Sequence, residues 1–195
     1  MRETKLARKT AETDIKISFS IDGSGKSDIA TGIGFFDHML TGFAKHGFFD
    51  LDVKVNGDLE VDGHHTVEDT GIVLGKAILT AAGDKKGIAR YGSFVLPMDD
   101  ALVLCSIDFC GRPYLNFDCD ISADKCGYFE TELVKEFFYA VSYTAGMNIH
   151  IKKMAGENSH HIIEACFKAF GKALDMATAK DPRITDVLST KGKLK

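Results

Sequence analysis

The stretch Gly63–Asp69 (GHHTVED) returns as Ser159–Ala165 (SHHIIEA), and this repetition is the best guide to the fold. Each copy places His-His-x-x-Glu at the start of an apolar stretch with helical periodicity. The copies are 96 residues apart, and at the same offset Gly75–Leu79 (GKAIL) falls on Gly171–Asp175 (GKALD). The sequence therefore predicts an internal duplication.

The hydrophobic pattern around the two motifs predicts similar elements in both halves. Strands are expected over residues 15–21, 27–31, 51–55, 91–96, 101–109, 114–121 and 147–153, and helices over 34–46, 66–82, 130–143 and 159–179. The predicted fold class is α+β, a single domain over residues 1–195 made of two pseudo-symmetric β-β-α-β-α halves. The halves cover approximately residues 10–88 and 89–180, and residues 181–195 form a C-terminal tail. Each half is expected to lay two helices on one face of a mostly antiparallel sheet, with an extra strand in the second half.

Composition narrows the class of protein. Of the 195 residues 45% are hydrophobic, and the formal charge of −4 is mild, so neither nucleic acid nor an anionic membrane is an expected partner. No apolar run approaches the roughly 18 residues of a membrane span, and the basic N-terminus lacks the apolar segment of a signal peptide. The five cysteines form no CxxC pair, which is typical of reduced thiols in a cytoplasmic protein.

Helix geometry gives the two motifs a metal-binding interpretation. On a helix, residues i and i+4 share a face, so His64 and Glu68 can chelate one ion while His65, rotated by about 100°, must point elsewhere. The second copy behaves in the same way, so each ion is expected to receive His-Glu from one copy and the second histidine of the other. This exchange predicts the ligand sets His64, Glu68, His161 and His160, Glu164, His65.

Two further histidines could each add a fourth ligand. His38 lies early in the first expected helix, and His150 lies on the strand before the second motif. Three imidazoles and one carboxylate leave two positions of an octahedral ion open for water or substrate. Mixed nitrogen and oxygen ligation suits Mn, Fe, Co, Ni or Zn, and six-coordination with open positions favours Mn(II).

Five short motifs together resemble one enzyme family. They are Gly34–Leu40 (GFFDHML), Gly63–Asp69, Asn148–His150 (NIH), Asn158–Ala165 (NSHHIIEA) and Ser189–Gly192 (STKG). Their order and spacing resemble imidazoleglycerol-phosphate dehydratase, the histidine-biosynthesis enzyme that removes water from a phosphorylated imidazole diol. The resemblance extends from Arg8 to Leu194.

The resemblance implies two Mn(II) ions per active site, held at subunit interfaces of a homo-oligomer of 24 subunits assembled from trimers. The implied ligands are His38, His65, His160 and Glu164 for one ion and His64, Glu68, His150 and His161 for the other.

Substrate contacts are also implied by the resemblance. The phosphate is expected at Arg90, Arg112, Ser189 and Lys191, and the other expected substrate-binding residues are Glu12, His38, His64, His160 and Thr190. Pro182 and the polar, basic end of the tail suggest a mobile strip that phosphate fixes. Many relatives have Asp-Gln where this chain has Thr41-Gly42, which leaves that glutamine's substrate contact unaccounted for.

The expected reaction is dehydration of D-erythro-imidazole-glycerol phosphate to imidazole-acetol phosphate by a dimetal lyase, through a metal-bound imidazolate. Glu68 and Glu164 are tied to metal, so Glu12 is the candidate acid/base and Glu164 the competing choice. Two alternatives remain open at this point. One is a dinuclear metal hydrolase that activates water, and the other is a structural protein whose ions only join subunits.

Overall fold

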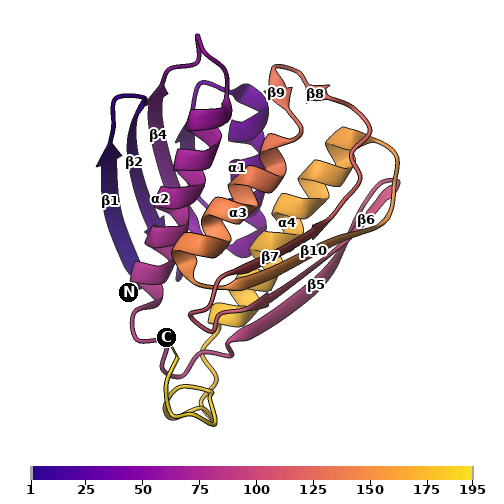
Figure 1. Cartoon of the computed structure of the whole chain (residues 1–195). Helices are drawn as coiled ribbons and strands as arrows, with labels where there is room; N and C mark the ends of the chain where they lie inside the picture. The colour runs from indigo at the N-terminus through magenta and orange to yellow at the C-terminus, as the bar shows by residue number, and fades with distance from the viewer. Residues whose placement is uncertain (1, 195) are drawn as a thin grey trace.

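The computed structural model describes residues 2–194 and contains the series β-β-β-α-β-α twice, with a short two-stranded hairpin added in the second half (Figure 1). The first half comprises β1 (Glu3–Lys9), β2 (Thr13–Ser20), β3 (Ser27–Ala30), α1 (Gly34–Gly47), β4 (Asp50–Gly57) and α2 (His64–Ala82). The second half comprises β5 (Tyr91–Met98), β6 (Ala101–Asp108), β7 (Tyr114–Asp118), β8 (Lys125–Cys126), β9 (Phe129–Glu130), α3 (Leu133–Ala145), β10 (Asn148–Ala155) and α4 (Ser159–Thr178). The predicted α+β class is confirmed. The predicted domain also takes in residues 1 and 195, which lie outside the described residues.

The two four-stranded sheets have the same topology. Their strand orders are β1-β2-β4-β3 and β5-β6-β10-β7, and in both only the last pairing is parallel. The small β8–β9 hairpin lies in the connection from β7 to α3, where the first half has a short link between β3 and α1. The predicted mostly antiparallel sheets are therefore confirmed.

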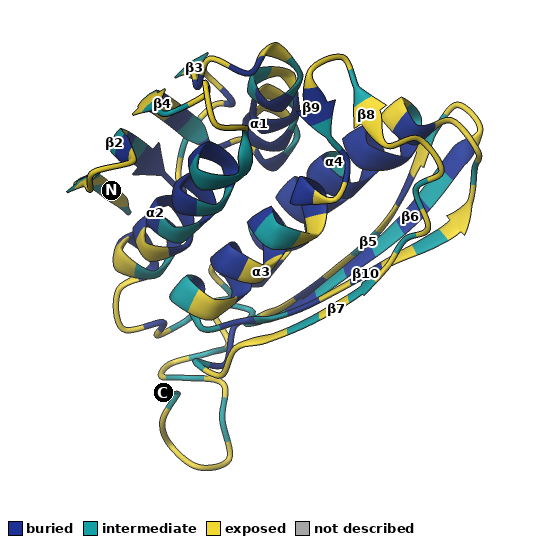
Figure 2. Cartoon of the chain, turned by 45° about the horizontal axis from the view of Figure 1, so that its top comes forward, coloured by how far each residue is buried: buried dark blue, intermediate teal, exposed yellow. Residues whose placement is uncertain are grey.

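The four helices lie between the two sheets, and their buried sides face both the sheets and one another (Figure 2). Helices α1 and α2 contact the first sheet, and α3 and α4 contact the second. Between the layers α2 packs on α3 and α1 packs on α4, so each helix pair joins the two halves. Among residues 2–194, no helix is long and apolar enough to span a membrane.

The two helix pairs cross at equivalent glycines. A Cβ on Gly75 of α2 would lie 2.8 Å from the carbonyl oxygen of Val141 in α3, and one on Gly171 of α4 would lie 2.6 Å from that of Phe43 in α1. Both distances are too short for a side chain, so glycine allows the backbones to approach closely. Phe43 of α1 and Val141 of α3 meet equivalent glycines and are therefore structurally equivalent residues. The other residues of α1 and α3 can be matched position by position from this pair.

The structure differs from the sequence-based expectation at the N-terminus. Residues Glu3–Lys9 form β1, so the first half begins before residue 10 and has one strand more than predicted. Their side chains alternate between exposed and partly buried and carry several charges, so no apolar alternation indicates a strand. Pairing with β2 along its whole length makes this segment a strand. Helix α1 ends at Gly47, one residue beyond the expected 34–46, and Phe48 after it adopts the left-handed conformation (φ 58°).

Candidate metal centre and anion pocket

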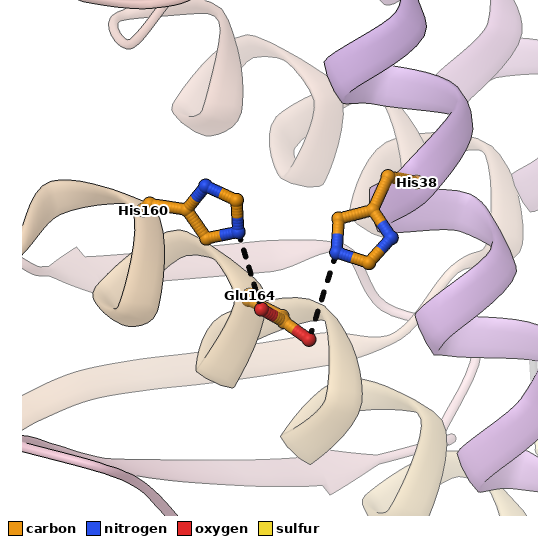
Figure 3. Close-up of side chains that lie close together, drawn as sticks. All are labelled: His38, His160 and Glu164. Carbon is orange, nitrogen blue, oxygen red and sulfur yellow. Dashed lines mark ion pairs between the residues drawn. The ribbon is translucent and has the colours of Figure 1, made fainter.

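Three predicted ligands form one cluster between α1 and α4 (Figure 3). His160 Nε2 lies 3.3 Å from Glu164 Oε2, and His38 Nε2 lies 3.7 Å from Glu164 Oε1. All three ligand atoms lie within 4.8 Å of one another, the two histidines are exposed and Glu164 is buried. Two imidazoles and a carboxylate converging on one point suit a divalent transition metal.

The start of α4 and its packing on α1 produce this cluster. The Asn158 side chain caps the helix by accepting a hydrogen bond from the amide of His161 at 3.2 Å, so the motif occupies the first turns. His160 and Glu164 then share one face, as predicted. His38 reaches the same carboxylate because α1 packs along α4.

Lys168 is a member of this site that the sequence analysis missed. Its Nζ lies 2.6 Å from Glu164 Oε1, one turn further along α4, and the i+4 spacing from Glu164 could have indicated it. Burial by itself would raise the pKa of Glu164, but Lys168, His38 and His160 together lower it below the usual value. The carboxylate is therefore held ionised, as a metal ligand must be.

The first motif copy is less complete within one chain. His64 Nε2 lies 3.8 Å from Glu68 Oε2, and both side chains are more than 40% exposed. Ile72 stands where the second copy has Lys168. The shared register of α1 and α3 places Glu136 at the position equivalent to His38, on the helix that packs against α2.

The second histidine of each copy points away from its neighbour and is backed by a carboxylate. His65 Nδ1 lies 3.0 Å from Asp58 Oδ2, and His161 Nδ1 lies 2.7 Å from Asp100 Oδ1. These hydrogen bonds leave Nε2 of each ring available as a ligand, and a carboxylate behind the imidazole is common in metal sites. The hydrogen bond to the Asp58 carboxylate raises the pKa of His65. The amides of Asn158 and Glu157, with His161, lower the pKa of Asp100.

A single chain does not assemble either complete predicted ligand set. Within the described part of the chain, the only metal-type cluster of three or more groups is the one formed by His38, His160 and Glu164. His150 is exposed on β10, between the inward-facing Ile149 and Ile151, and its ring lies 5.6 Å from that of Tyr114. It therefore lies on the face of the sheet opposite the helices, so its ligand role stays a prediction.

The predicted phosphate residues, in contrast, do come together. A cavity of about 510 Å³ is lined by Arg90, Tyr91, Arg112, Leu188, Ser189, Thr190, Lys191, Lys193 and Leu194. Arg90 donates to Asp108 Oδ1 at 2.7 Å and to the carbonyl of Leu188 at 2.8 Å, which fastens the tail beside β6. Asp108 also raises the pKa of Arg90. The other cationic residues of the lining, Arg112, Lys191 and Lys193, make this cavity suitable for an anion.

Glu12 lies in the loop between β1 and β2, beside the first motif. Its Oε1 is 3.8 Å from His65 Nε2, and Glu12 lines a hollow of about 380 Å³ together with Asp58.

Thr41 is exposed on α1, and its hydroxyl donates to the carbonyl of Asp37 at 2.8 Å. A Cβ on Gly42 would lie 3.7 Å from Lys168 Cγ. The Thr41-Gly42 pair, which replaces the Asp-Gln of many relatives, therefore lies near the lysine that pairs with Glu164.

Comparison with known proteins gives a consistent assignment. The family model "Imidazoleglycerol-phosphate dehydratase" matches residues 31–174. A protein of that name from Lachnoclostridium phytofermentans is 65% identical over 98% of this chain and 97% of its own length. Another, from Acetivibrio thermocellus, is 64% identical over 99% of both chains.

Solved structures agree. The Staphylococcus aureus enzyme of the same name superposes with a TM-score of 0.84 at 42% identity, covering 92% of this chain and 99% of that one. The Pyrococcus furiosus enzyme, in complex with (S)-C348, gives 0.83 at 41% identity, covering 97% and 100%. The chain therefore belongs to the imidazoleglycerol-phosphate dehydratase family, a family of hydro-lyases.

Proposed function

We propose that this protein dehydrates D-erythro-imidazole-glycerol phosphate to imidazole-acetol phosphate in L-histidine biosynthesis, in the cytoplasm. The family assignment supports the reaction. The observation that carries it is the pairing of two separate sites on one chain. A His-His-Glu cluster suits a metal, and a cavity lined by Arg112, Ser189 and Lys191 suits a phosphate.

The donor set fits two divalent ions such as Mn(II). His38, His160 and Glu164 already converge within 4.8 Å, and Lys168 keeps the carboxylate ionised. Bound metal would supply Lewis-acid polarisation of the substrate's imidazole ring and a template that orients it.

Neighbouring copies of the chain would complete both sites. His65 and His161 point away from the His-Glu pair of their own motif. We therefore assign His65 of a neighbouring copy to the cluster of His38, His160 and Glu164. His161 of a neighbouring copy joins His64 and Glu68. His150, or Glu136 by its equivalence to His38, is the fourth ligand of that second site. This division of ligands supports a homo-oligomer, and we propose the 24-subunit assembly that the family resemblance implies.

The chain's other residues bind the substrate and move protons. Arg112 and Lys191 bind the phosphate oxygens, and Ser189 donates a hydrogen bond. Arg90 is already paired with Asp108 and positions the tail as well as contributing charge. Glu12 is half exposed and lies 3.8 Å from His65 Nε2, whereas Glu164 is buried and lies 2.6 Å from Lys168 Nζ. Glu12 is therefore the better acid/base for the substrate carbon.

A direct assay tests this proposal. Purified oligomer with added Mn(II) should consume imidazoleglycerol phosphate and form the acetol without releasing inorganic phosphate, and a chelator should stop the reaction. Phosphate release would instead favour the hydrolase alternative. Absence of any turnover in a metal-loaded oligomer would favour the structural alternative.

A matched variant separates proton transfer from assembly. Glu12→Gln should bind metal and assemble normally yet lose turnover, because the amide cannot carry a proton. An unchanged rate would remove Glu12 from the chemistry.

A further inference from the structure

A buried carboxylate next to the first motif has no role in the site as described above. Asp69 directly follows Glu68 on α2 and is only 6% exposed. The Thr13 hydroxyl donates to Asp69 Oδ2 at 2.5 Å, and Arg8 Nη1 forms an ion pair with the same oxygen. A buried charge of this kind is costly unless it is paired, so both partners are needed.

The two partners of Asp69 flank the loop that carries Glu12. Arg8 lies near the end of β1 and Thr13 is the first residue of β2. Between them the Thr10 hydroxyl accepts the amides of Glu12 at 3.2 Å and Thr13 at 3.0 Å. The loop is therefore fastened to α2 at both ends and folded on itself between them.

A second connection links this loop to His65. The Glu12 carbonyl accepts the amide of Asp58 at 3.1 Å, and Asp58 in turn holds His65 Nδ1 at 3.0 Å. Glu12 and His65 thus share a frame, in which Glu12 Oε1 lies 3.8 Å from His65 Nε2.

The other half of the molecule lacks this device. Ala165 follows Glu164 where Asp69 follows Glu68, so α4 carries no carboxylate at that position. The corresponding β5–β6 turn is held instead by Asp100, whose Oδ2 accepts the amides of Glu157 at 2.7 Å and Asn158 at 3.0 Å. The contacts of Asp69 with Arg8 and Thr13 therefore occur in the half that carries Glu12.

We propose that Arg8, Asp69 and Thr13 form a positioning network that fixes the Glu12 carboxylate relative to His65. The inference rests on the proposed role of Glu12 as acid/base. A displacement of about 1 Å at a reacting group can cost about 100-fold in rate. Loss of the network should therefore lower kcat by about 10-fold to 100-fold and leave bound metal and KM nearly unchanged.

A double-mutant cycle with Glu12 tests the network. Thr13→Val keeps the β-branched shape of the strand residue and removes only the hydroxyl, and Asp69→Asn is the companion variant. If Thr13 acts through Glu12, Thr13→Val should cost 10-fold or more in the wild-type background and should lower the residual turnover of Glu12→Gln no further. Thr80→Val on α2, the helix that carries Asp69, is the matched control, because its exposed hydroxyl donates to the Lys76 carbonyl, and it should leave kcat unchanged.

Hydrogen exchange gives a readout that does not depend on turnover. The amides of Thr10, Glu12, Thr13 and Asp58 should exchange faster in Thr13→Val than in wild type or Thr80→Val. Equal losses of kcat in both Glu12 backgrounds, or unchanged exchange in this loop, would overturn the proposal. Inactive wild-type protein would instead count against the proposed function, and the exchange rates would then decide alone whether the network holds the loop.

Discussion

The two helix pairs have the same backbone arrangement but different side chains around the same motif. In α1–α4 the His160–Glu164 pair meets His38 and Lys168, and Glu164 is buried. In α2–α3 the corresponding positions are Glu136 and Ile72, and the His64–Glu68 pair remains exposed. Both crossings depend on an equivalent glycine. Duplication has thus kept the His-Glu pairs and the helix packing, while within the described residues only the α1–α4 pair brings a third metal-type group to its motif.

The largest effect is expected from the motif carboxylates themselves. Glu164→Gln and Glu68→Gln should each lower kcat by about 100-fold to 1,000-fold, because each amide weakens the charge stabilisation at one site. Manganese measured by mass spectrometry on the purified oligomer should fall by one ion per site in each variant. Glu157→Gln, an exposed neighbour at the start of α4, is the control. Retention of full metal content and turnover in Glu164→Gln would contradict the metal site of the α1–α4 pair.

A smaller effect is expected at the carboxylates behind the second histidines. Asp58→Asn and Asp100→Asn should each weaken manganese binding by about 10-fold to 100-fold, the range for groups that orient metal-binding histidines. Asp100→Asn should also lower the melting temperature more, because Asp100 accepts the amides of Glu157 and Asn158 ahead of α4. Titration with Mn(II) and thermal melts of the metal-free variants measure the two effects. Equal melting temperatures would show that Asp100 has no additional structural role.

Glu136 and His150 are alternative fourth ligands of the site that contains His64 and Glu68, and a pair of variants distinguishes them. If α3 repeats the role of α1, Glu136→Gln should weaken one of the two manganese sites by about tenfold, and His150→Ala should leave both unchanged. Binding isotherms of the intact oligomer separate the two sites. The reverse result would restore His150 as the fourth ligand and would mean that the helix symmetry does not extend to the metal.

The smallest effect is expected from Lys168 in the metal-free protein. Because the pKa of Glu164 is below its usual value, its contribution to stability is present above the unfolded-state pKa of about 4.3 and is lost as pH falls through the lower folded pKa. Lys168→Met should therefore reduce the free energy of unfolding by about 1–3 kcal/mol at neutral pH, and the difference should shrink below about pH 4. Ile72→Met places the same side chain at the equivalent position of α2, and its unfolding free energy should show no such pH dependence. Chemical denaturation at a series of pH values measures both, and a gap that persists at pH 3 would exclude ionised Glu164 as its source.

Local features of the site could be predicted because helix geometry depends on near neighbours in sequence. The i+4 spacing places His64 with Glu68 and His160 with Glu164, and turns His65 and His161 elsewhere. The carboxylates behind those second histidines could not be foreseen in the same way. Asp100 is 61 residues from His161, and no periodicity connects the two.

The sequence by itself determined the order of the elements apart from β1 and the β8–β9 hairpin, the duplication, and the types of residue that can bind metal and phosphate. Those depend on periodicity and side-chain chemistry, which are present in the unfolded chain. The family resemblance grouped His38 with Glu164 and Arg90 with the tail, but only the tertiary structure shows these contacts, and it alone reveals that Asp69 fastens the loop of Glu12. Each of these contacts joins residues far apart in sequence, so it exists only after the sheets and helices have packed.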